Sequence, residues 1–210
     1  MKRILLALTV LLSVQLADAQ VKSPEAVKKA VDAAEAASKD AKKATKVATW
    51  LKLATAYMDA YNAPKGSAWI GASKQELQLV MGSEKPVSSE QVVLGGEPCM
   101  KEVYADKEIY FNQNGQVIMI YVTKPIYENA LSQALEAYKK AYEVDVKKSK
   151  EKDITAGIQS ITQNLMDDGM SSYMFEDYAT ASRLFGQAVE ASATAPLSQV
   201  DTISLYNAAF

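Results

Sequence analysis

The sequence predicts a mainly α-helical protein that carries one α+β insertion. Residues 23–62 are rich in Ala and Lys, and their apolar residues recur at the spacing of amphipathic helices. Helical periodicity returns at residue 126 and continues to the C-terminus. Between them, residues 65–125 contain more Gly, Ser and Pro, and their apolar spacing falls toward two. This change of period marks the insertion as a region of strands and turns.

Two helices are expected before the insertion, over about residues 24–38 and 40–61. Ser23 occupies the N-cap position of the first helix, and Pro24 its first turn, where a missing N–H costs nothing. Asp40 is suited to cap the second helix, and Asn62 marks its end.

The insertion begins with a short helix. Ser73 and Glu76 have the spacing of a capping box, which predicts a helix over residues 76–81. The adjacent glycines Gly95 and Gly96 indicate a turn. They do not indicate a phosphate-binding loop, because no Lys-Ser/Thr follows them.

A β-hairpin is expected in the second half of the insertion. Residues 103–111 and 116–122 are rich in β-branched and aromatic side chains, and Asn114-Gly115 between them is a strong hairpin signal. Both faces of these strands are apolar. One face is therefore expected to pack on the helices and the other on the rest of the insertion. An exposed edge that accepts a partner strand is the alternative.

Composition excludes several functional classes. The chain has 210 residues, with 23 Lys+Arg against 25 Asp+Glu and a formal net charge of −2, which argues against nucleic-acid binding. It contains no histidine, so Ser-His-Asp catalysis and His-ligated zinc are excluded. Cys99 is the single cysteine and cannot form an internal disulfide. It is expected to be a small buried hydrophobic residue, and a reactive or intermolecular thiol is the alternative.

The first 19 residues have the pattern of a secretory signal peptide. A basic start at Lys2-Arg3 precedes an apolar run over residues 4–14, and Ala17-Asp18-Ala19 is a small-x-small cleavage signal. The mature chain is expected to begin near Gln20, without a membrane-spanning segment, and to reside in the periplasm or to be secreted.

The helical regions contain a repeat-like spacing of small and aromatic residues. It occurs in a first copy at Trp50, Leu53, Ala54, Tyr57, Ala134, Tyr138 and Ala141, and in a second copy at Leu165, Gly169, Tyr173, Tyr178, Ala181, Phe185 and Ala188. This spacing resembles the tetratricopeptide repeat (TPR) family over about residues 47–61 and 126–210. Together with the signal peptide, it resembles exported TPR-like proteins of bacteria. A generic helical bundle is the alternative, since any amphipathic helix has similar spacing.

The resemblance implies a fold and a domain organisation. The fold would be a TPR-like α-α hairpin solenoid, with the α+β insertion splitting the first repeat. The organisation would be a signal peptide at 1–19, N-terminal helices at 20–64, the insertion at 65–125 and TPR-like helical repeats at 126–210. A third copy begins at Leu205, so the chain is either part of a longer array or covers its last apolar face with a neighbouring molecule.

In the second copy, Ala181 and Ala188 would allow the two helices to approach closely. Phe185 and Tyr178 would fill the space between this pair of helices and the next. In the TPR family the first helices of successive repeats line a concave groove that holds a peptide or a partner helix. The resemblance therefore implies partner-binding groove residues at Lys52, Thr55, Asp59, Gln163, Met166, Met170, Tyr173 and Asn207.

Met and Tyr suit adaptable contacts with a protein partner, although Met166 and Met170 could equally belong to the core. No catalytic, cofactor or metal residue is predicted, so the sequence favours an interaction scaffold without enzymatic activity. Self-association through the C-terminal helical end is a further expectation. The alternative is an envelope enzyme or glycan-binding module with a pocket in the insertion, formed by Trp69, Tyr104 and Tyr121.

Overall fold

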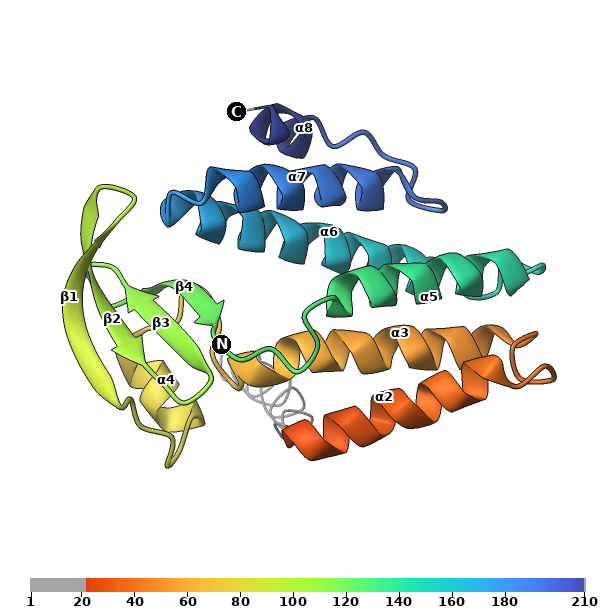
Figure 1. The fold of residues 1–210 in the computed structure, drawn as a ribbon, viewed down its shortest axis with the longest axis horizontal. Coiled ribbons are helices and arrows are strands. Elements are labelled where there is room, and N and C mark those ends of the chain that lie inside the picture. The colour runs from red at the N-terminus through yellow and green to blue at the C-terminus, as the bar shows by residue number, and fades with distance from the viewer. Residues whose placement is uncertain (1–21, 210) are drawn as a thin grey trace, which may run out of the picture.

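A computed structural model describes residues 22–209, so the predicted signal peptide lies outside the described residues. Figure 1 shows a stack of helices with a small sheet at one end. The helices of the stack are α2 (Pro24–Lys39), α3 (Val47–Asn62), α5 (Ala130–Val144), α6 (Glu151–Met174), α7 (Tyr178–Ala193) and α8 (Thr202–Ala208). The short helix η1 (Ala63–Lys65) follows α3 directly. The insertion then contains α4 (Lys74–Val80), β1 (Ser88–Leu94), β2 (Glu97–Val103), β3 (Lys107–Phe111) and β4 (Val117–Val122). The predicted mixture of helices with an α+β insertion is therefore confirmed.

Each helix of the stack packs against the next one along the chain, and the most extensive contacts join α3 to α5 and α6 to α7. The α3–α5 pair forms although the whole insertion lies between its two members. These pairs are the ones that the repeat-like spacing predicts. Within residues 22–209, no helix is both long and apolar enough to cross a bilayer.

The first two helices are separated by a longer turn than expected. The Ser23 side chain caps α2 by accepting from the amide of Ala26, as predicted. Asp40 does not cap α3, because its side chain accepts from the amides of Lys42 and Lys43 in a turn that ends before Val47. The predicted start of the second helix at residue 40 was therefore wrong.

Trp50 fastens this turn to α3. Its indole Nε1 donates to the carbonyl of Ala44 at 2.7 Å, while its ring packs half-buried against the helical core. Trp50, the first residue of the repeat-like spacing, thus packs against the helical core and also holds the turn through its hydrogen bond.

Close approaches at glycine fix the spacing of the later helices. A Cβ on Gly169 of α6 would lie 2.8 Å from the buried Phe185 ring of α7, and one on Gly157 would overlap Tyr138 of α5. Ala181 and Ala188 of α7 are both buried, and Ala188 belongs to the helical core. Tyr178 was expected to fill the space between the α6–α7 pair of helices and the next. It is instead exposed, with its ring 5.4 Å from that of Tyr173.

The insertion folds into a four-stranded antiparallel meander, in the order β1-β2-β3-β4, within the described chain. The capping box of Ser73 and Glu76 is present and starts α4. The predicted Asn114-Gly115 hairpin joins β3 to β4, with Gly115 at φ 73°, where a residue without a Cβ is favoured. The turn at Gly95-Gly96 joins β1 to β2.

The expected strand over residues 103–111 is two strands, because a turn after Val103 separates β2 from β3. This break puts Tyr104 on the same face of the sheet as Ile109, whereas an unbroken strand would have placed it with Tyr110.

The two faces of the sheet pack as predicted. Ile109, Phe111 and Val117 face Leu77 of α4. On the opposite face, Tyr110 and Met119 pack with Met174 at the end of α6. Cys99 is buried in this second cluster, as predicted, and burial raises the pKa of its thiol. The sheet is therefore held against the C-terminal end of α6.

Candidate functional site

Three of the predicted groove residues meet in one cavity of about 390 Å³. Met170 and Tyr173 of α6 and Asn207 of α8 line it, together with Phe185 and Tyr206. We call this cavity the C-terminal hollow. Met170 and Tyr173 are 46% and 51% exposed, so their side chains are accessible rather than part of the core.

Helix α8, which forms one wall of the hollow, is held in place by hydrogen bonds. Asp201 caps α8 by accepting from the amide and hydroxyl of Ser204. Ser182 of α7 donates to the carbonyl of Ala208 at 2.7 Å, which ties the end of α8 to α7. The buried Phe185 ring completes the lining from α7. The hollow is therefore a built concavity between three helices.

The other predicted groove residues lie elsewhere. Gln163 lines a separate cavity beside the α7–α8 connector, and Met166 packs half-buried against the helical core. On α3, Lys52 and Thr55 are exposed, and Thr55 hydrogen-bonds with Tyr138 of α5. Asp59 pairs with Lys22 at 2.6 Å, an exposed contact near the start of α2.

A second cavity, of about 530 Å³, lies where the sheet meets the helices. Sequence reasoning did not predict it. We call it the junction cleft, and its walls come from the end of α3, η1, the sheet, the β4–α5 connector, α6 and α7. Its principal lining residues are Tyr61, Lys65, Glu108, Tyr121, Tyr127, Glu128, Asp168, Ser171, Ser172, Phe175 and Asp177.

The inner end of the junction cleft holds three ionisable groups. The Tyr61 hydroxyl donates to Asp168 Oδ1 at 2.9 Å, and Lys65 Nζ lies 3.9 Å from the centre of the Tyr61 ring. Burial raises the pKa of Asp168, although Lys65 and the Tyr61 hydroxyl oppose this shift. Burial lowers the pKa of Lys65, against the attraction of Asp168 and Asp167. Such perturbed groups in a cleft are typical of functional sites.

Aromatic rings form one wall of the junction cleft. Phe175, at the end of α6, contacts Tyr121 of β4 with ring centres 5.0 Å apart and Tyr110 of β3 at 5.7 Å, both edge to face. Tyr121 and Phe175 remain partly exposed. The wall therefore both joins the sheet to α6 and presents apolar surface to the cleft.

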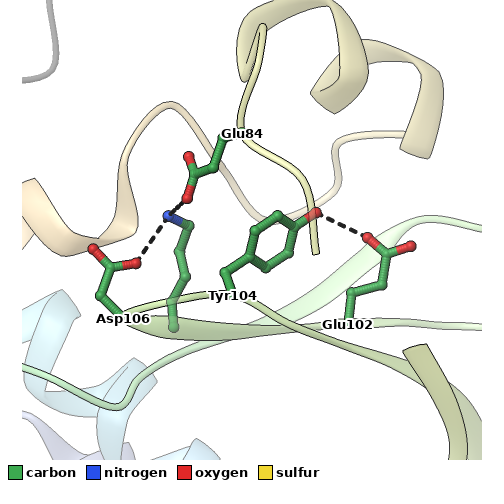
Figure 2. A network of polar contacts seen from close by, with 5 residues as sticks. Glu84, Glu102, Tyr104 and Asp106 are labelled. Carbon is green, nitrogen blue, oxygen red and sulfur yellow. Dashed lines mark hydrogen bonds and ion pairs between the residues drawn. The ribbon is translucent and has the colours of Figure 1, made fainter. Parts of the chain in front are cut away.

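A buried ionic network lies on the α4 side of the sheet (Figure 2). Lys107 is 2% exposed, and its ammonium binds Glu84 and Asp106, whose carboxylates converge on it. Just after β2 the Tyr104 hydroxyl donates to Glu102 of that strand at 2.9 Å. Lys74 pairs with the same carboxylate. These charges satisfy one another, so the network fastens α4 and its following loop to the sheet.

The aromatic pocket expected within the insertion is not formed by the three residues proposed for it. Tyr104 is buried on the α4 side of the sheet, whereas Tyr121 lines the junction cleft on the other side. Trp69 is partly exposed in the segment before α4. No group of His, Cys, Asp and Glu residues between positions 22 and 209 is arranged to hold a metal ion.

The polar core of the junction cleft has no local signature in the sequence. Tyr61 and Asp168 are 107 positions apart. Comparison with known proteins adds no assignment, since the chain matches no family model, no curated protein and no solved structure.

Proposed function

We propose that the protein is an exported, TPR-like scaffold that binds a partner protein through the C-terminal hollow and has no catalytic activity of its own. The observation that carries this proposal is the hollow itself, which gathers Met170, Tyr173 and Asn207 from two helices. The successive packing of α5, α6, α7 and α8 supports a hairpin solenoid of the TPR type.

The chemistry of the hollow suits a peptide with an apolar anchor. The Met170 thioether is flexible and polarisable, so it can repack around different side chains. Tyr173 and Tyr206 offer large aromatic area at low entropic cost, a composition enriched in protein interfaces. Asn207 supplies an amide that can bind a peptide backbone. We therefore expect an extended or helical segment with a Leu, Met or aromatic side chain at its centre.

Selection from a random peptide library against the full chain tests this proposal. Met170→Asp should weaken binding of the selected peptides at least about tenfold, because it places a carboxylate in the apolar hollow. Val146→Asp is the matched control, since Val146 is 88% exposed after α5 and distant in sequence from the hollow. Equal affinity of both variants, measured by fluorescence anisotropy, would remove the hollow from partner binding.

Self-association is a second candidate, favoured by the exposed apolar side chains of α8. Ile203 and Leu205 are 63% and 54% exposed. Sedimentation over a range of protein concentrations should then reveal a dimer that Leu205→Asp dissociates. A concentration-independent monomer mass would contradict self-association and leave the peptide proposal intact.

A further inference from the structure

The junction cleft has both an open hydrogen-bond donor and an open acceptor at its inner end. In the part of the chain that the structure describes, no carboxylate lies within 4.0 Å of Lys65 Nζ, whose contact is with the Tyr61 ring. Asp168 uses Oδ1 to accept from Tyr61, and its second oxygen has no hydrogen bond to the described chain. A ligand that completes the hydrogen bonds of half-buried polar atoms in a cavity binds with a more favourable free energy.

The charges around the junction cleft disfavour an anion, and Lys65 disfavours a cation at the inner end. Glu108, Glu128 and Asp177 line the cavity in addition to Asp168, so an anion would meet several carboxylates. A cation at the inner end would meet the ammonium of Lys65. A neutral ligand avoids both repulsions. It must nevertheless accept from Lys65 and donate to carboxylates, so it must carry groups that do both.

The walls of the junction cleft add apolar and hydroxyl contacts. The partly exposed rings of Tyr121 and Phe175 provide flat apolar surface. Ser171 and Ser172 donate their hydroxyl hydrogens to backbone carbonyls of their own helix, so their oxygens remain acceptors toward the cavity they line. The volume of about 530 Å³ lies within the range of small-molecule sites.

We propose that the junction cleft is a binding site for a neutral carbohydrate. A sugar ring presents apolar C–H faces for Tyr121 and Phe175, and its hydroxyls both accept from Lys65 and donate to Asp168. The site requires the insertion and the helical stack together, because its lining comes from both. This inference concerns a different cavity from the C-terminal hollow and is independent of the peptide proposal.

Calorimetric titration of the full chain with maltose, cellobiose, lactose and N,N′-diacetylchitobiose tests the proposal. We expect at least one of these neutral disaccharides to bind at a single site. Asp168→Asn keeps the shape of the side chain and an acceptor for Tyr61 but loses the charge, and it should weaken binding about tenfold or more. Tyr121→Ala should do the same by removing the apolar wall.

Asp167→Asn is the matched control, because Asp167 is exposed and accepts from Gln163 on its own helix. It should bind the sugar as the original chain does. Circular dichroism and thermal unfolding verify that each variant folds. The hollow-selected peptides, which are those selected from the random library for the C-terminal hollow, should bind the Asp168→Asn variant with unchanged affinity.

Three outcomes would overturn the proposal. They are no binding by any of the four disaccharides at millimolar concentration, equal binding by Asp168→Asn and the original chain, and preferential binding of argininamide over the sugars. The last result would assign the junction cleft to a cation instead.

Discussion

Gly169 shows how a single residue sets the distance between two helices. Its missing side chain lets the buried Phe185 ring of α7 lie against the backbone of α6, where a Cβ would come within 2.8 Å of Cε1. Real Cβ atoms do not approach that closely, so any larger residue must move the ring or the helix. Because the C-terminal hollow is lined by these same helices, its shape depends on this contact.

Gly169→Ala should therefore destabilise the protein by about 1–3 kcal/mol, the usual cost of overpacking a core. Gly186→Ala is the matched control on α7, since a Cβ there meets nothing within 4 Å. Relieving the entropic cost of a helical glycine should stabilise it by about 0.5–1 kcal/mol. Urea unfolding at neutral pH measures both free energies. A stabilising Gly169→Ala would contradict the close approach of α6 and α7.

At the scale of elements, Asp145 organises the connection between α5 and α6. It is 2% exposed and accepts hydrogen bonds from the Ser149 amide, the Ser149 hydroxyl and the Lys150 amide. Burial opposes its ionisation, but these hydrogen bonds outweigh burial and lower the pKa of the carboxyl. The charged run that begins at Lys147 is thus anchored at one buried carboxylate.

Asp145→Asn should lower the free energy of unfolding at neutral pH, because an amide replaces one acceptor oxygen by a donor. A lowered pKa means that the carboxylate stabilises the fold above the ordinary value of about 3.9, and that this contribution disappears as the pH falls through the folded value. The difference between variant and original chain should therefore shrink in acid. Asp153→Asn, which removes an exposed pair with Lys150, should show little effect at either pH.

Urea unfolding at pH 7 and pH 3 measures this difference. A gap between Asp145→Asn and the original chain that is equal at both values would show that the carboxylate charge is not responsible.

In the ionic network of the insertion, the lysine is buried but its carboxylate partners are partly exposed. Lys107 is 2% exposed, whereas its partners Glu84 and Asp106 have side chains 39% and 37% exposed. Removing the lysine leaves carboxylates that water can reach. Removing both carboxylates leaves a buried ammonium without a counter-charge, which is far more costly.

Lys107→Met should therefore change the free energy of unfolding by no more than about 1 kcal/mol, since a well-packed apolar residue often replaces a buried ion pair at little cost. The double variant Glu84→Gln with Asp106→Asn should lose about 3–5 kcal/mol. Chemical denaturation compares the two. If Lys107→Met were the more damaging change, the network would depend on its lysine stem rather than on charge compensation.

At the scale of the whole molecule, local patterns predicted the elements, and distant contacts determined the sites. The capping box at Ser73 and the turn at Asn114-Gly115 involve neighbouring residues, so the sequence alone was sufficient to predict both. Helical spacing likewise predicted the burial of Ala181 and Phe185. The start of α3 was predicted wrongly because Asp is favoured both at helix N-caps and in turns. The identity of Asp40 alone does not show which of the two it forms.

The junction cleft was missed for a different reason. Its inner end combines Tyr61 at the end of α3 with Asp168 on α6, and its aromatic wall combines Tyr121 with Phe175. Each residue alone has an ordinary environment in the sequence. Their meeting depends on how the sheet docks on the helical stack, which no periodicity encodes. The C-terminal hollow was partly predicted because its α6 residues follow a repeat spacing within one helix.

The helical stack and the insertion have largely separate cores. The buried residues of the helical core all come from α2, α3, α5, α6 and α7. The two smaller clusters belong to the insertion, and Met174 is the residue of α6 that packs against one of them. Since α3 and α5 pack extensively against each other, their association should not require the sheet between them.

Replacing residues 66–124 by a Gly-Ser linker of about ten residues should therefore leave a folded helical stack, because closing a flexible loop of this length costs little. Far-UV circular dichroism should retain the helical signal, and thermal unfolding should stay cooperative. Binding of the hollow-selected peptides should persist, whereas disaccharide binding should be lost with the Tyr121 and Glu108 wall of the junction cleft. An unfolded product, or one that still binds the sugar, would show that the helices and the insertion do not divide the two functions in this way.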